Sequence, residues 1–137
     1  MLRGFGNARY GDKIGSDGYF RVYGMGFDRD NTFLRSGREG INNWYIGQGG
    51  FRGDWLPANG AKASIQGNFY GGEIAQPAPG DLTVDGQNLV GRWTHALANN
   101  SEISLQAYWD RTSRRIPNSI TEVLNTYDVE FQHRVAL

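Results

Sequence analysis

The feature that most constrains the fold is a period-two alternation, in which every second residue is apolar or glycine over seven separate stretches. Helical periodicity does not compete with this pattern anywhere, so it predicts β-strands throughout the chain. The predicted strands are Gly4–Tyr10, Tyr19–Asp28, Trp44–Trp55, Lys62–Tyr70, Asn88–Ala96, Ile103–Arg111 and Thr126–Arg134. Most have about nine to eleven residues, which matches a tilted membrane-spanning strand better than the ~5–6 residues typical of soluble sheets.

The connections between these strands alternate in length. The short ones are rich in Gly, Asn, Asp or Pro and read GDKIGSDG, LPANGA and LANNSE. The long ones read RDNTFLRSGREGINN, GGEIAQPAPGDLTVDGQ and TSRRIPNSITEVLN. This order predicts an antiparallel up-and-down meander of about seven strands, with tight turns at one end and large loops at the other. Outer-membrane barrels sort their loops in this way, whereas soluble β-sandwiches mix hairpins with crossovers.

The two faces of the predicted strands differ in composition. In the third strand one face reads Tyr45, Gly47, Gly49, Phe51, Gly53 and Trp55, and the other carries Gln48, Arg52 and Asp54. From the second strand onward we expect no charged residue on the first face. That face is rich in Gly, Ala and aromatic residues and poor in the bulky aliphatic residues that a closely packed core needs, and lipid can fill the gaps beside its glycines. We therefore expect lipid to contact the Gly-rich aromatic face, and a water-filled lumen to lie behind the charged face.

The spacing of two aromatic residues in the third strand and the composition of the chain agree with this prediction. Tyr45 and Trp55 are separated by roughly 25 Å along a barrel axis at ~3.3 Å rise and ~40° tilt, which is the height of the apolar band between aromatic girdles. Gly accounts for 20 of 137 residues, about twice the usual ~7% share, and cysteine is absent. The formal net charge of zero does not point to nucleic acid or anionic lipid.

Several phrases resemble successive barrel strands of a known family. In chain order they are ARYGDKIGSDGYFRVYGMGFDRD, GQGGFRGDW, NLVGRWTHAL, ISLQAYWDRT and LNTYDVEFQHR. Together they are similar to TonB-dependent outer-membrane receptors, most closely to the branch for ferric siderophores and related chelates. The resemblance covers essentially the whole chain and implies the early part of a barrel that has about 22 strands in full, with a plug in its lumen.

This resemblance implies both the domain organisation and the function. No signal peptide, energy-coupling box or plug domain is visible, so we expect residues 1–137 to be a partial barrel domain, either a fragment or a truncated reading frame. It implies a place in the bacterial outer membrane and a role in the uptake of ferric chelates, to which the chain contributes barrel wall and loops. The implied partners are outer-membrane lipid, lipopolysaccharide and a ferric chelate, with the TonB complex reached only through the missing plug; no nucleic acid and no cofactor are expected.

The long predicted loops supply the candidate ligand-binding residues. Guanidinium groups can hold anionic chelates by bidentate hydrogen bonds, and an aromatic ring where a loop joins a strand can stack on a ligand. The candidates are Arg29, Arg35, Arg38, Trp44, Arg111, Arg114 and Arg115. The alternatives are that these arginines bind lipopolysaccharide phosphates or solvate the loops, and that Trp44 belongs to the outer aromatic girdle.

Other possible chemistry gives little support for an enzyme or a metal site. The carboxylate pairs Asp28/Asp30 and Asp128/Glu130 are best explained as strand-end and lumen charges opposite arginines. His95 and His133, the only histidines, are expected near the short turns at the lipid rim. We therefore expect no enzyme and no metal. The rival hypothesis is a soluble all-β module that binds a ligand such as a carbohydrate through its aromatic residues.

Overall fold

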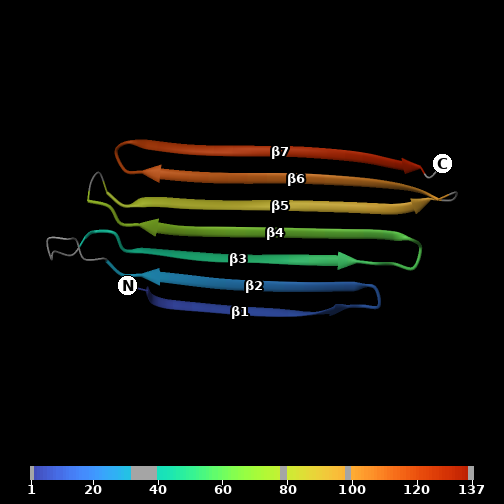
Figure 1. The fold of residues 1–137 in the computed structure, drawn as a ribbon, viewed down its shortest axis with the longest axis horizontal. Helices are drawn as coiled ribbons and strands as arrows, with labels where there is room; N and C mark the ends of the chain where they lie inside the picture. Colours follow the sequence, from blue (N-terminus) through green and yellow to red (C-terminus); the bar gives the residue numbers. More distant parts are fainter. Residues whose placement is uncertain (1, 32–39, 78–79, 98–99, 136–137) are drawn as a thin grey trace.

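The computed structural model describes residues 2–31, 40–77, 80–97 and 100–135. It is a single antiparallel sheet of seven strands in which each strand pairs with the next one along the chain (Figure 1). The strands are β1 (Leu2–Ile14), β2 (Gly18–Arg29), β3 (Trp44–Trp55), β4 (Ala61–Ile74), β5 (Leu82–Leu97), β6 (Ser101–Ile116) and β7 (Ile120–Val135). The prediction of an all-β antiparallel meander is confirmed. No helix in the described residues is long and apolar enough to cross a membrane.

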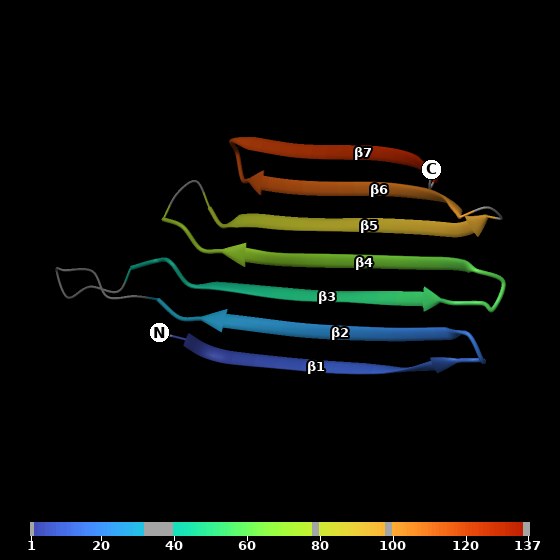
Figure 2. The ribbon, with the colours of Figure 1, turned by 45° about the vertical axis from the view of Figure 1, so that its right-hand side comes forward.

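The sheet is open at both sides. Within the described ranges, β1 pairs only with β2 and β7 pairs only with β6, so each outer strand has one free edge (Figure 2). Every residue of β7 is exposed. Unpaired backbone groups along a strand this long are ready to hydrogen-bond with a further strand.

The sheet has no core of its own. Ala61 and Leu82 are the only apolar residues buried in the part of the chain that the structure describes, whereas large apolar side chains are exposed on every strand. A sheet normally buries one face against a second layer. Since this sheet has only one layer, its stability requires something outside the described residues to cover its apolar surface.

The third long connection is not a loop, contrary to the prediction. β6 runs on to Ile116 and β7 starts at Ile120, so Arg111, Arg114 and Arg115 are strand residues. The chain turns at residues 117–119, where Asn118 has a φ of 54° and the Ser119 N–H donates to the Ile116 carbonyl over 3.2 Å. Asn tolerates this left-handed conformation, which closes a short hairpin. The second long connection also shortens to residues 75–81, and only the first, at 30–43, stays long.

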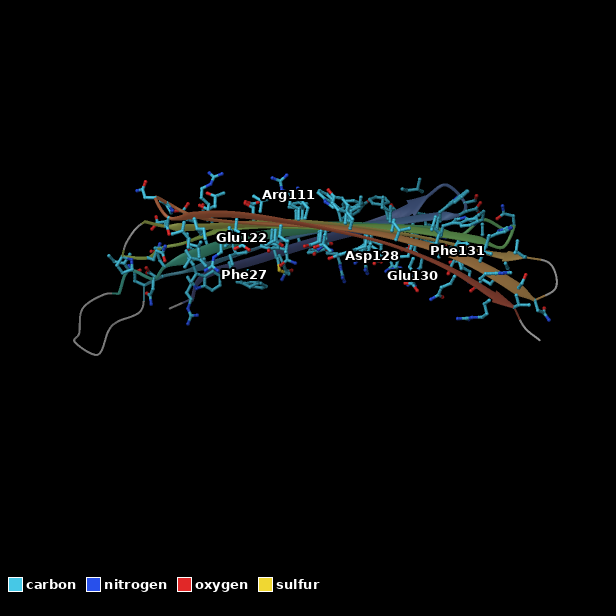
Figure 3. All side chains as sticks on the ribbon, turned by 90° about the horizontal axis from the view of Figure 1, so that it is seen from above. Phe27, Arg111, Glu122, Asp128, Glu130 and Phe131 are labelled. Carbon is cyan, nitrogen blue, oxygen red and sulfur yellow. The ribbon has the colours of Figure 1, made fainter. Side chains whose placement is uncertain are left out.

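The strand register confirms that residues of like character share a face. Directly paired residues across the sheet form a row that runs Tyr10, Val22, Phe51, Gly67, Leu89, Trp109 and Tyr127. We call the face that carries this row the stripe face and the opposite one the charged face. Figure 3 shows Arg111 and Phe131 on one side of the sheet and Asp128 and Glu130 on the other.

From β2 onward the stripe face does carry charges, contrary to the prediction, but only near the loop end of the sheet. Asp28 and Arg111, at the ends of their predicted strands, both have stripe-face parity. Beyond the predicted strand limits, Glu73, Asp85 and Arg115 lie on the same face. The error arises because strands β4 to β7 continue beyond the apolar segment, so one face passes from apolar to polar along its length.

Some of the space beside the glycines is filled by protein rather than left open for lipid. A Cβ atom built on Gly67 would lie 2.5 Å from Cε1 of Phe51, and one on Gly49 would lie 2.6 Å from Cζ of Phe69. In both cases an aromatic ring of the neighbouring strand covers the glycine. A Cβ on Gly26 or Gly91, by contrast, would meet nothing within 4 Å.

Candidate functional site

The apolar part of the stripe face has an oblique border at the loop end. Asp28 on β2 and Glu73 on β4 lie in one row, joined through Tyr45. On the stripe face of β6, Arg111 is the first charged residue in the direction from the turns to the loops. Its row contains Phe69 and Gly49. That row lies four residues closer to the turns than Glu73, since Phe69 precedes Glu73 by four residues on β4. The border thus lies in one row on β2 and β4 and is displaced by four residues on β6, an average of one residue per strand from β2 to β6.

The turn end of the sheet is displaced in the same direction by the same amount. Gly18, the first residue of β2, shares a row with Trp93 on β5. Beyond Trp93, β5 continues four residues further in the direction of the turns, to Leu97. Leu97 pairs with Ser101 at the turn between β5 and β6. The stagger of the turns is visible at the right-hand side of Figure 1. The border of the apolar surface and the line of the turns are therefore displaced in the same direction and by the same total amount across the sheet.

This displacement fixes an angle. Averaged over β2 to β6, one residue per strand is a shift of about 3.3 Å for each strand spacing of about 4.8 Å, which corresponds to an angle of about 35°. Strands in closed and membrane-spanning barrels tilt by about 35–45°. When the strands are tilted by that angle, the polar border on β2 becomes level with that on β6, as do the first and third turns, and the apolar surface approximates a horizontal band.

The charged face changes character toward the loop end, where it becomes apolar. One row there contains Phe5, Phe27, Ile46 and Val84, and the rings of Phe5 and Phe27 lie 5.0 Å apart between centroids. The next residues of the same parity are Trp44, Ile74 and Leu82. We call these seven residues the inner apolar patch. Alternation within the predicted strands did not reveal it, because most of these residues lie at strand ends or in segments taken for loops.

The structure divides the candidate ligand residues between the two faces. Arg29 pairs with Trp44 of the inner apolar patch, and both lie on the charged face. Arg114, paired with Val84 and Glu122, lies on the same face at the other side of the patch, about 19 Å from Arg29 across the sheet at four strand spacings. Arg111 and Arg115 lie on the stripe face. Arg35 and Arg38 lie outside the described residues.

A chain of polar side chains crosses the middle of the charged face. The Tyr23 hydroxyl donates to Oδ1 of Asn68 over 2.8 Å and accepts from Nε2 of Gln48 over 3.3 Å. Nδ2 of Asn68 donates in turn to Oδ1 of Asn88 over 3.0 Å. Four strands are therefore linked by side chains as well as by backbone. Such a continuous set of satisfied polar groups suits a wall that faces water.

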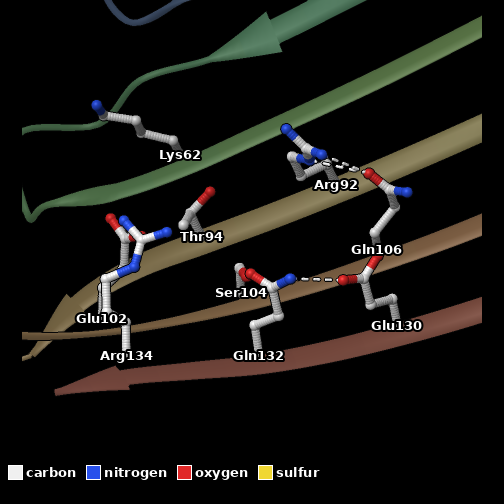
Figure 4. A pocket seen from close by; sticks show the side chains of 9 residues that line it. All are labelled: Lys62, Arg92, Thr94, Glu102, Ser104, Gln106, Glu130, Gln132 and Arg134. Atoms are coloured by element: carbon white, nitrogen blue, oxygen red, sulfur yellow. Dashed lines mark hydrogen bonds between the residues drawn. The ribbon is translucent and has the colours of Figure 1, made fainter.

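The turn end of the charged face is hollowed and strongly polar. A hollow of about 300 Å³ lies over β4 to β7 (Figure 4). Within it Arg92 donates two hydrogen bonds to Oε1 of Gln106, at 3.0 and 2.7 Å, and Glu102 pairs in register with Arg134. On β3, Arg52 holds the Asp54 carboxylate through Nε and an Nη at 2.8–3.0 Å. Basic and acidic groups alternate here, which favours a hydrated surface over a site for one charged ligand.

The carboxylate pair on β7 and the two histidines considered from the sequence do not come together in one site. Asp128 and Glu130 follow each other along the exposed edge strand β7 on the charged face, opposite Tyr108 and Gln106. His95 and His133 flank Ile103 on the stripe face near the turns. Among the described residues no group of three or more His, Asp or Glu side chains could hold a metal ion.

No protein-family model matches this chain, and no match is found among curated proteins or solved structures. The features of the molecule that bear on function are therefore the two faces of the sheet and the residues at its loop end. The stripe face offers an apolar band, and the charged face offers a polar wall with the inner apolar patch, which includes Trp44 and lies beside Arg29 and Arg114.

Proposed function

We propose that this chain is a segment of a transmembrane β-barrel wall, and that it belongs to an outer-membrane receptor for ferric siderophores or similar chelates. The observation that carries the proposal is the oblique apolar band. An untilted sheet covered by a second layer has no reason to displace its polar border by an average of one residue per strand in step with its turns. A tilted strand in a bilayer must do so, because the hydrocarbon boundary is flat.

Lipid supplies the missing cover for the stripe face. The band contains Phe20, Phe51, Phe69, Leu105 and Phe131, whose exposure in water would be costly at about 25 cal/mol for each Å² of apolar surface. The charged face behind it carries the Tyr23, Asn68 and Asn88 chain and the polar hollow, as expected for a lumen. The free edges of β1 and β7 are then the positions at which the rest of a barrel would continue the sheet.

The loop end of the charged face is the proposed ligand-contact surface. Ferric siderophore complexes combine anionic oxygen donors with apolar or aromatic parts. Arg29 and Arg114 are suited to the first by charge-assisted hydrogen bonds, and Trp44 and the Phe5–Phe27 pair are suited to the second. The specific support for this assignment is that these groups share one face at one end of the sheet.

The experiment that tests the membrane assignment is fractionation of a Gram-negative host that secretes the chain into its periplasm. We expect the chain in the outer-membrane fraction, released by detergent but not by high salt or alkaline carbonate. A monomeric chain in the soluble periplasmic fraction would contradict the proposal and favour the soluble binding module.

A further inference from the structure

Two arginines lie just past the aromatic end of the apolar band on the stripe face. Trp109 and Tyr127 are directly opposite each other on β6 and β7, and Arg111 is the next stripe-face residue of β6 toward the loops. Arg115 lies on the same face four residues after Arg111, with Ser113 between them. On a strand tilted by about 35°, each step from one residue of this face to the next is roughly 5 Å of depth.

These guanidinium groups are free to bind an external partner. Both side chains are exposed, and in the described part of the chain neither has a hydrogen-bond or ion-pair partner. Arg111 pairs with Gln87 and Asn125, and Arg115 pairs with Thr83 and Thr121, so only neutral polar groups stand beside them in their rows.

The charges on this part of the stripe face are not balanced locally. Past Trp109 and Tyr127, β6 and β7 present two arginines and no acidic residue on this face. The nearest acid of the same face, Asp85 on β5, pairs with Ser113 in the row between the two arginines. The other acids at the border, Asp28 and Glu73, lie on β2 and β4, further from this hairpin.

We infer that Arg111 and Arg115 form a binding surface for the negatively charged phosphate groups of membrane lipids. This inference rests on the proposed membrane location of the chain. Tryptophan and tyrosine rings lie at the membrane interface, and a guanidinium one step further out reaches the phosphate level. Its planar set of donors forms two parallel hydrogen bonds to phosphate. Ligand binding by these two residues, considered from the sequence, is disfavoured because they face away from the inner apolar patch.

Arg114 provides a matched control. It lies on the same strand at nearly the same height, but on the charged face opposite Glu122, so Arg114→Gln removes the same charge without removing a lipid contact. The variants to compare are Arg111→Gln, Arg115→Gln and Arg114→Gln, with Arg111→Lys to restore the charge at the first position.

The experiment measures urea unfolding of the full chain in phosphatidylcholine vesicles, with and without added phosphatidic acid. We expect phosphatidic acid to raise the ratio of folded to unfolded chain about fivefold for each participating arginine. Arg111→Gln and Arg115→Gln should each lose one such factor, Arg114→Gln should keep both, and Arg111→Lys should recover part of the effect. The gain should also fall as salt is added.

Several results would overturn the inference. They are no gain for the unchanged chain, an equal loss in Arg114→Gln, and an equal gain from free inorganic phosphate in vesicles that lack phosphatidic acid. Each of these would leave the membrane proposal standing if the chain still folds in phosphatidylcholine. A chain that folds in no bilayer would overturn both.

Discussion

The phenyl ring of Phe51 on β3 lies over Gly67 on β4, so closely that a Cβ on Gly67 would come within 2.5 Å of the ring. Phe69 on β4 covers Gly49 on β3 in the same way, which makes the arrangement reciprocal. On the charged face the ring of Tyr70 covers Gly86. A ring laid over a glycine of the next strand pins the strand register and shields the exposed backbone. Part of the glycine content is therefore explained by contacts within the sheet itself.

This contact predicts a specific penalty at Gly67. Gly67→Ala should lower the free energy of unfolding by about 1–3 kcal/mol, because the methyl group displaces the Phe51 ring. Gly91→Ala, where the added methyl meets open space, should have no such cost. The measurement is urea unfolding in lipid vesicles. If Gly67→Ala is as costly after Phe51→Ala as before it, the ring contact is not the cause.

A second prediction compares two exposed positions on one face of β7. Val129 is 73% exposed and lies in the middle of the apolar band, whereas Asn125 shares the row of Arg111 at its border. In a membrane, Val129→Arg should cost about 2–4 kcal/mol and Asn125→Arg about 0–1 kcal/mol. The same unfolding experiment measures both variants. Near-equal, small effects would indicate that water, not hydrocarbon, surrounds Val129.

A third prediction concerns the hydrogen bond between Tyr23 and Asn68. Tyr23→Phe and Asn68→Ala should each destabilise the sheet by about 1 kcal/mol, and the double variant should cost less than the sum of the two. A double-mutant cycle on unfolding free energies measures this coupling. Strict additivity would mean that the 2.8 Å contact contributes nothing to stability.

A fourth prediction tests the ligand-contact surface. Arg29→Gln and Arg114→Gln should each weaken binding of ferric citrate or a ferric hydroxamate by about tenfold, because each removes a charge-assisted hydrogen bond. Arg111→Gln, on the opposite face, is the matched control and should bind normally. Titration of the membrane-inserted chain with the iron complex provides the measurement. Equal losses in all three variants would indicate a general effect of charge.

The sequence was sufficient to predict the strands and their faces but not the strand ends. Alternation identified β3 at its observed limits, Trp44–Trp55, because Gly and aromatic residues alternate there without a break. It failed past Arg111, where Arg114 and Arg115 interrupt the pattern although the backbone continues to pair. Within that segment, Pro117 and Asn118 were the available signal for a short hairpin.

The candidate site was predicted less well than the fold, for a related reason. The assignment of arginines to loops could not separate Arg111 from Arg114, which lie on opposite faces of one strand. The inner apolar patch depends on pairing between strands that are far apart in the sequence, such as Phe5 on β1 with Phe27 on β2. Register between strands is a tertiary property, so the residues that gather at one end of a sheet become visible only with the structure.

The most direct test of the central claim is a cysteine scan of β6, which is favoured by the absence of natural cysteine. Spin labels at Leu105, Gln106, Ala107 and Tyr108 in the vesicle-inserted chain would report collisions with oxygen, which concentrates in lipid, and with a water-soluble nickel complex. We predict that oxygen dominates at positions 105 and 107 and nickel at 106 and 108. Equal access of the nickel complex to all four positions, or the opposite alternation, would contradict a stripe face that lies in hydrocarbon.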